Sequence, residues 1–213
     1  MELHHNWRTG VNHDLYLQIA IDRFYDAEKA YLDFYRQIQS DGEKQYFDPS
    51  APIRQNCIET VCFSAMAAES FINTFSAVYI SESFAKTIDH LDACAKWTVV
   101  MKAYKGIELL YGEAPLQRLS QTIKKRNSFV HSKSRKLREQ NDSFVFPELD
   151  IIEDYLNPAH DSLLAIKDCH DWISNHCDSS TLNFDIQAIN LEEIAKYKST
   201  EKFYHFMEPI MII

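Results

Sequence analysis

The fold is decided above all by residues 52–80, PIRQNCIETVCFSAMAAESFINTFSAVYI. Pro52 suits the first turn of a helix, and apolar residues then recur at helical spacing as far as Ile80. Two polar residues, Glu69 and Asn73, fall inside the apolar face and need partners there. The stretch therefore predicts one long helix with a buried face. That face carries Ile58, Val61, Cys62, Ala65, Met66, Ile72 and Tyr79.

Helical patterns also flank this stretch on both sides. Ser81-Glu82-Ser83 can cap a third helical region, and Asn157-Pro158 should kink or restart the last one. Residues 43–52 and 141–147 read as connectors. The other helical segments are expected over 12–40, 84–105, 116–123, 124 to about 138, and 151 to about 175.

Length and composition favour an all-α protein. The 213 residues include only four Gly and six Pro, too few turn residues for a fold of many strands. A chain of this length can bury a substantial core. We expect one helical domain over residues 1–177 and a C-terminal extension, residues 178–213, packed on the same domain.

The cysteines and the N-terminus indicate a cytoplasmic protein. Five Cys is an odd number, their spacing fits no zinc site, and most lie in apolar helical patterns. The first residues lack the layout of a signal peptide, and no stretch approaches eighteen uncharged apolar residues. We therefore expect neither secretion nor a membrane span.

A basic run interrupts this acidic chain of net charge −9. From Lys124 to Arg138 there are seven Lys or Arg and no Asp or Glu, which leaves fifteen basic against thirty-one acidic residues elsewhere. This asymmetry indicates a local site for a polyanion. Within the run lies the motif Arg126-Asn127-Ser128-Phe129-Val130-His131, in which four residues separate the Arg from the His.

The residue types in this motif suit phosphodiester cleavage. On a helix Asn127 and His131 lie on one face, one turn apart, and Arg126 can bend toward them from the helix start. A guanidinium stabilises developing charge on a phosphate, and an imidazole can move a proton near neutral pH. In RNA the neighbouring 2′-hydroxyl can be the nucleophile, so no metal is needed.

Metal chemistry finds no support in the sequence. It contains no carboxylate cluster typical of two-metal nucleases, no HExxH pattern and no Cys/His zinc signature. His4, His5 and His13 are expected to be tag-like or solvated rather than metal ligands. We expect no metal and no cofactor, which makes DNA hydrolysis harder to explain than RNA cleavage.

The motif and its context resemble the HEPN superfamily (higher eukaryotes and prokaryotes nucleotide-binding). In that family an Arg is followed by a polar residue and then by a His four to six positions later. The stretch Ala68-Glu69-Ser70-Phe71-Ile72-Asn73 is similar to a Glu- and Asn-bearing helix of many prokaryotic members, and the succession Trp97, Gly106, Leu119 is similar too. The resemblance covers roughly residues 12–176.

This resemblance implies a bundle of four or more antiparallel helices that homodimerises, with the motif helices facing each other. Members with the motif are commonly metal-independent endoribonucleases, often toxins in toxin–antitoxin, phage-defence or CRISPR-associated systems, so an antitoxin is a possible partner. Arg126 would stabilise the scissile phosphate, His131 would be the acid/base group, and Asn127 would orient His131 or the phosphate. Glu69 and Asn73 would support the motif, while the residues that bind the RNA backbone would be Lys124, Lys125, Lys133 and Arg135.

Less specific interpretations stay open. The same residues could decorate a solvated helix, and Glu69 and Asn73 could make structural hydrogen bonds in the core. A non-catalytic module could use the basic site to bind RNA, a nucleotide or a partner protein. A purely structural helical dimer is a third alternative.

Overall fold

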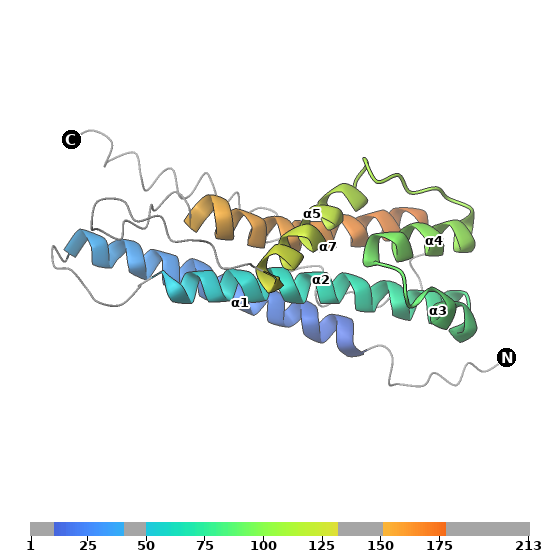
Figure 1. Ribbon diagram of the computed structural model, residues 1–213, viewed down its shortest axis with the longest axis horizontal. Coiled ribbons are helices and arrows are strands. Elements are labelled where there is room, and N and C mark those ends of the chain that lie inside the picture. Colours follow the sequence, from blue (N-terminus) through green and yellow to red (C-terminus); the bar gives the residue numbers. More distant parts are fainter. Residues whose placement is uncertain (1–10, 41–49, 132–150, 178–213) are drawn as a thin grey trace.

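The computed structural model describes residues 11–40, 50–131 and 151–177, and no strand occurs in these parts. The expectation of an all-α protein is confirmed (Figure 1). The elements are α1 (Val11–Ser40), α2 (Ala51–Tyr79), α3 (Glu82–Ile88), α4 (Ala93–Lys105), α5 (Leu116–Val130), a π-helical segment η1 (Ile152–Leu156), and α7 (Asn157–His176).

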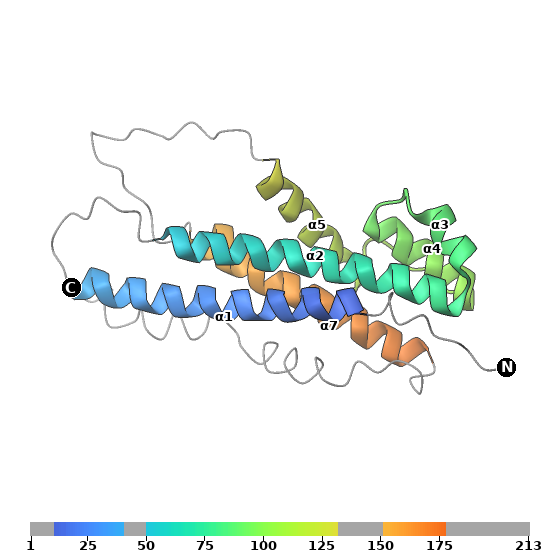
Figure 2. The same ribbon diagram turned by 90° about the horizontal axis from the view of Figure 1, so that it is seen from below.

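The three long helices form the body of the molecule. Helix α1 runs antiparallel to α2 and to α7, and α3 and α4 lie together at one end of α2 (Figures 1 and 2). Helix α5 crosses α2 and α7 obliquely, and in Figure 2 its C-terminal end stands away from α2. This crossing helix carries the Arg-Asn-x-x-x-His motif.

Local sequence signals set several helix ends as expected. Pro52 lies in the first turn of α2, and the Ser81 hydroxyl accepts a hydrogen bond from the Phe84 amide at 3.1 Å. Gly106 ends α4 in the left-handed conformation, with φ of 70°, which glycine adopts without steric cost. Asn157-Pro158 marks the change from η1 to α7, as the sequence predicts.

Two helix boundaries differ from the predictions. The segment expected as one helix from residue 84 to 105 is divided into α3 and α4, because Asp92 caps a new helix by accepting from the Ala95 amide at 3.0 Å. The segments expected as 116–123 and 124 to about 138 begin as one helix, α5. No helix-breaking residue separates Leu119 from Lys124, so the helix continues and ends at Val130.

This second difference changes the position of the motif. Arg126 and His131 belong to the last turns of α5 rather than to a helix start, and His131 caps the helix through its amide, which donates to the Asn127 carbonyl at 2.9 Å.

Several expectations lie outside the described residues. They concern the N-terminal segment with His4 and His5, most of connector 43–52, connector 141–147, the extension 178–213, and Lys133, Arg135, Lys136 and Arg138.

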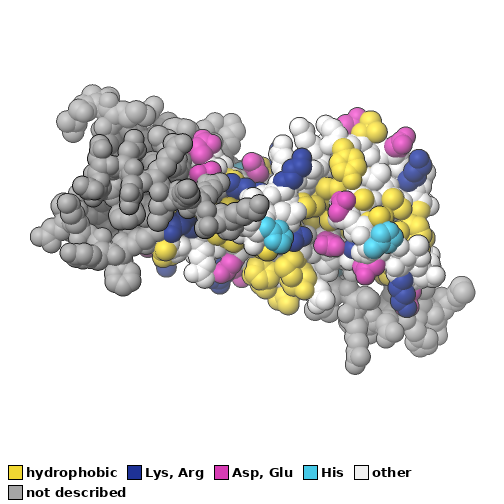
Figure 3. Space-filling view, viewed as in Figure 1, with side chains coloured by type: hydrophobic (Ala, Val, Ile, Leu, Met, Phe, Trp, Pro, Cys, Tyr) yellow, Lys and Arg dark blue, Asp and Glu magenta, His cyan; other side chains and the backbone are white. Residues whose placement is uncertain are grey.

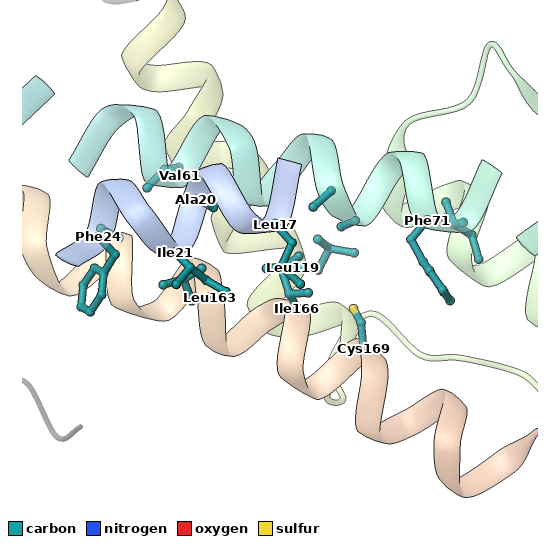
Figure 4. Close-up of a cluster of buried hydrophobic side chains, with 14 of the residues drawn as sticks. Leu17, Ala20, Ile21, Phe24, Val61, Phe71, Leu119, Leu163, Ile166 and Cys169 are labelled. Carbon is teal, nitrogen blue, oxygen red and sulfur yellow. The ribbon is translucent and has the colours of Figure 1, made fainter. Parts of the chain in front are cut away.

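The core lies where α1, α2, α5 and α7 meet. Figure 4 shows side chains from all four helices pointing into this region. The buried face of α2 differs from the prediction, since Met66 is 40% exposed and Ile58 and Cys62 are half-buried. The labelled core residues are Leu17, Ala20, Ile21, Phe24, Val61, Phe71, Leu119, Leu163, Ile166 and Cys169.

Helix α2 is long and largely apolar. An 18-residue window reaches a mean hydropathy of 1.3, so the helix is long and apolar enough, by length and composition, to cross a membrane. It still contains no run of eighteen uncharged apolar residues, because Arg54, Glu59 and Glu69 interrupt it, and the absence of a membrane span stays a prediction. In the bundle α2 packs against α1, α3, α4, α5 and α7, and this central place requires apolar residues around most of the helix.

Candidate functional site

The candidate site is the C-terminal end of α5. Lys124, Asn127 and His131 are exposed there, whereas Lys125 and Arg126 are half-buried. Hydrophobic, basic and histidine side chains are interspersed on the face of the molecule shown in Figure 3. At the end of α5, positive charge and the His131 imidazole lie beside Val130, which is 57% exposed.

Arg126 turns toward α2. Burial raises the pKa of the Cys62 thiol on that helix, and the nearby Arg126 guanidinium partly opposes the shift. The Nε of Arg126 is buried and has no hydrogen-bond partner among the described residues. A buried donor without a partner is uncommon and costs free energy, so the partner of this Nε is expected outside the described residues.

Asn127 and His131 occupy the outer side of the same helix end. The amide of His131 donates to the carbonyl of Asn127, which places the two residues one turn apart as the sequence predicts. In the described parts of the chain neither side chain makes a hydrogen bond or ion pair. Five helical steps of about 100° separate Arg126 from His131, so the two side chains leave the helix in different directions.

The electrostatics of a helix end differ from those of a helix start. The C-terminal end carries a partial negative charge and presents carbonyl oxygens, and the last turn of α5 holds no Lys or Arg, since Lys124, Lys125 and Arg126 precede it. A phosphate at this end must be bound by side chains, because the backbone offers no row of amide donors there. About two turns before Arg126 on α5, Arg118 forms an ion pair with Asp168 of α7 and is therefore already engaged.

An aromatic pair that sequence reasoning missed adjoins the motif. The rings of Phe129 and Tyr155 stack with an interplanar angle of 5° and 5.6 Å between centroids. The Nζ of Lys125 lies 5.0 Å from the centroid of the Phe129 ring, in the range of a cation–π contact. The only sequence signal for this group is the spacing of four between Lys125 and Phe129, since Tyr155 belongs to a distant segment.

Glu69 is engaged away from the motif. Its carboxylate accepts a hydrogen bond at 2.8 Å from Nζ of Lys96 on α4, and Asp89 lies 3.6 Å from the same Nζ. Lys96 is only 1% exposed. The polar partner that Glu69 requires on its apolar face is therefore a buried lysine, which a periodicity argument would place on the solvent side.

Asn73 and His13 complete the predicted polar positions. Asn73 is half-buried on α2, and its backbone carbonyl accepts from the Ser76 hydroxyl at 2.8 Å. His13 is not a solvated residue, because its ring packs edge-on against Phe71 with 5.6 Å between centroids, and burial lowers its pKa. In residues 11–40, 50–131 and 151–177, no three His, Cys, Asp or Glu side chains gather in an arrangement that could hold a metal.

All five cysteines are free thiols. Burial raises the pKa of Cys57 to about 12 and that of Cys94 to about 11, so neither thiol ionises near neutral pH. Cys57 and Cys94 are therefore packing residues rather than reactive thiols.

No protein-family model matches the sequence, and no curated protein or solved structure matches it. The helices of the structure establish the fold class, an all-α bundle. The relation to the HEPN superfamily stays a prediction, and it depends on the motif of α5 and the Glu- and Asn-bearing helix α2.

Proposed function

We propose that this chain is a metal-independent endoribonuclease of the HEPN type that cleaves single-stranded RNA as a homodimer. One observation carries the proposal. The motif lies at the end of α5 that stands away from α2 in Figure 2, and the side chains of Arg126, Asn127 and His131 make no hydrogen bond to another described residue. Polar groups left without internal partners are suited to bind a ligand.

The chemistry follows from the residue types. The 2′-oxygen of a ribose attacks the adjacent phosphorus, and the bond from phosphorus to the 5′-oxygen breaks. His131 takes the 2′-hydroxyl proton or delivers a proton to the leaving 5′-oxygen, and Arg126 stabilises the charge on the phosphoryl oxygens. The products are a 2′,3′-cyclic phosphate and a 5′-hydroxyl, and no metal or cofactor takes part.

A dimer solves a geometric difficulty of the single chain. Arg126 turns toward α2, whereas His131 faces outward from the same helix end. A two-fold axis beside α5 would bring a second Arg126 and a second His131 to one composite site. Val130, which is 57% exposed, offers apolar surface for such a contact.

The proposal is tested by incubating the purified protein with labelled single-stranded RNAs of varied sequence in EDTA. We expect cleavage that is unaffected by the chelator, with 2′,3′-cyclic phosphate ends identified by mass spectrometry. Intact RNA under these conditions would remove the nuclease proposal. Analytical ultracentrifugation at the same protein concentration gives the oligomeric state, expected to be a dimer.

A non-catalytic module that binds RNA at the same site is the second candidate. The observation in its favour is that no described side chain orients the His131 imidazole, whereas a catalytic base is usually held by a third group. This candidate predicts salt-dependent binding without any covalent change in the RNA.

Both candidates predict that Lys124 and Lys125 contact phosphates. Replacing either lysine with alanine should reduce the slope of log K against log salt concentration by about 0.7, because one fewer counterion is released from a single strand. The matched control is Lys102→Ala on α4, whose side chain is 65% exposed and lies 3.6 Å from Glu108. Fluorescence anisotropy titrations at several salt concentrations measure the slopes, and equal slopes for all three variants would exclude a phosphate contact.

A further inference from the structure

The stacked pair Phe129–Tyr155 joins a residue within the motif to η1 but has no part in the cleavage chemistry. Phe129 follows Asn127 by two residues on α5, and both aromatic side chains are only partly buried. The Phe129 ring has Tyr155 stacked on it and Lys125 over it. Tyr155 thus ends a short stack at the edge of the candidate site.

An irregularity of the backbone brings Tyr155 to this position. The amide of Asn157 donates to the carbonyl of Ile152, five residues earlier, which makes η1 a π-helical turn. Pro158 follows at the start of α7 and has no amide hydrogen to continue an α-helical ladder. The wider turn sets the direction of Tyr155, and such turns are frequent at functional sites.

The hydroxyl of Tyr155 makes no hydrogen bond to any residue that the structure describes. A tyrosine that is fully part of a core usually finds such a partner. Tyr155 therefore combines a partly buried ring, stacked on Phe129, with a hydroxyl that has no partner among the described residues.

The charges around the stack separate two kinds of ligand group. Lys124 and Lys125 lie on the α5 side, whereas the exposed Glu153 and the half-buried Asp154 lie next to Tyr155 on η1. Phosphates are attracted to the lysines and repelled by the two carboxylates. An uncharged aromatic group, in contrast, can lie against Tyr155 without that repulsion.

We propose that Tyr155 stacks a nucleobase of single-stranded RNA, while the phosphates of the same strand lie along Lys124, Lys125 and Arg126. This inference rests on the proposed function, because it names the part of the RNA that the site binds beside the motif. Stacking of this kind positions the strand and tolerates every base, since each base has an aromatic face. Tyr155 is thus a positioning residue for the strand.

The test compares two fluorescent RNA oligomers of one length, one with bases throughout and one abasic at every internal position. Affinities are measured by anisotropy in the His131→Ala background, which keeps the RNA intact. We expect Tyr155→Leu to bind the base-bearing oligomer roughly ten- to a hundredfold more weakly, with unchanged affinity for the abasic oligomer. Tyr155→Phe keeps an aromatic ring and should retain the affinity of the parent.

The outcomes separate stacking from a structural role. Equal weakening for both oligomers, or no weakening for either, would overturn the proposal. If circular dichroism shows that Tyr155→Leu does not fold, the same two affinities are measured for Tyr155→Trp instead. The larger indole should then strengthen binding of the base-bearing oligomer alone, and an unchanged preference between the oligomers overturns the proposal.

A cleavage assay with the parent protein tests the proposed function separately. If the parent does not cleave RNA but Tyr155→Leu still weakens binding of base-bearing RNA, the nuclease proposal is rejected and the stacking proposal is retained. If the parent cleaves RNA but Tyr155→Leu has no effect on binding, the nuclease proposal is retained and the stacking proposal is rejected.

Discussion

His131→Ala is expected to lower the rate of RNA cleavage about 100- to 10,000-fold, the usual contribution of one positioned acid/base group. The side chain is exposed and bonds to no other residue in the described parts of the chain, so its loss should leave the fold intact. The backbone hydrogen bond from residue 131 to Asn127 survives the substitution. Single-turnover cleavage of end-labelled RNA in EDTA measures the rate, and anisotropy measures the affinity, which should change little.

The matched control is His90→Ala, because His90 is also exposed and lies in the turn between α3 and α4. That variant should cleave at the parental rate. Arg126→Lys provides a second comparison, since it keeps the positive charge but loses the planar guanidinium, and it should also be slow. Parental activity in His131→Ala would remove the enzyme proposal and leave the binding module.

The largest expected effect on stability comes from Glu69→Met. This change removes the closest partner of Lys96 and leaves a buried ammonium with only Asp89 nearby, at 3.6 Å. Breaking a buried ion pair from one side costs about 3 kcal/mol of unfolding free energy or more, because the remaining charge is desolvated. Urea unfolding followed by circular dichroism at fixed protein concentration should show a lower midpoint with an unchanged slope.

The reverse substitution makes this prediction specific. Lys96→Met removes the buried charge, and the carboxylates it leaves behind are 37% exposed for Glu69 and 78% exposed for Asp89, so water can still solvate them. Lys96→Met should therefore cost clearly less than Glu69→Met, and the double substitution should recover part of the loss. A greater loss of unfolding free energy for Lys96→Met than for Glu69→Met would contradict this account. If Glu69→Met folds but no longer cleaves RNA, Glu69 supports the candidate site as the sequence predicts.

Much of the fold was predictable because helix ends depend on neighbouring residues. Pro52, Ser81 and Gly106 act through their own backbone geometry or a bond three residues away, and each marks a boundary where expected. The break before α4 was missed because Asp92 is an equally good helix-surface residue until its side chain caps the next helix. The buried face of α2 was partly misplaced because neighbours surround this helix and apolar residues occur on most of its sides.

The candidate site was predictable only in part, for a related reason. The motif of α5 is local in sequence, so its residues could be named and the pairing of Asn127 with His131 on one turn is confirmed. Lys96 and Tyr155 meet Glu69 and Phe129 across long stretches of chain, and only the packing of the helices brings them together. Their residue types carry no signal of these contacts.

Helix α5 is anchored unevenly. Its buried residues, Leu116, Leu119 and Thr122, all belong to the first half, which the ion pair from Arg118 to Asp168 also ties to α7. The second half is held by partly buried side chains, those of Ile123, Arg126 and Phe129. We therefore expect a bound molecule to shift the last turn more readily than the first half, which would adjust the motif to that molecule without opening the interior.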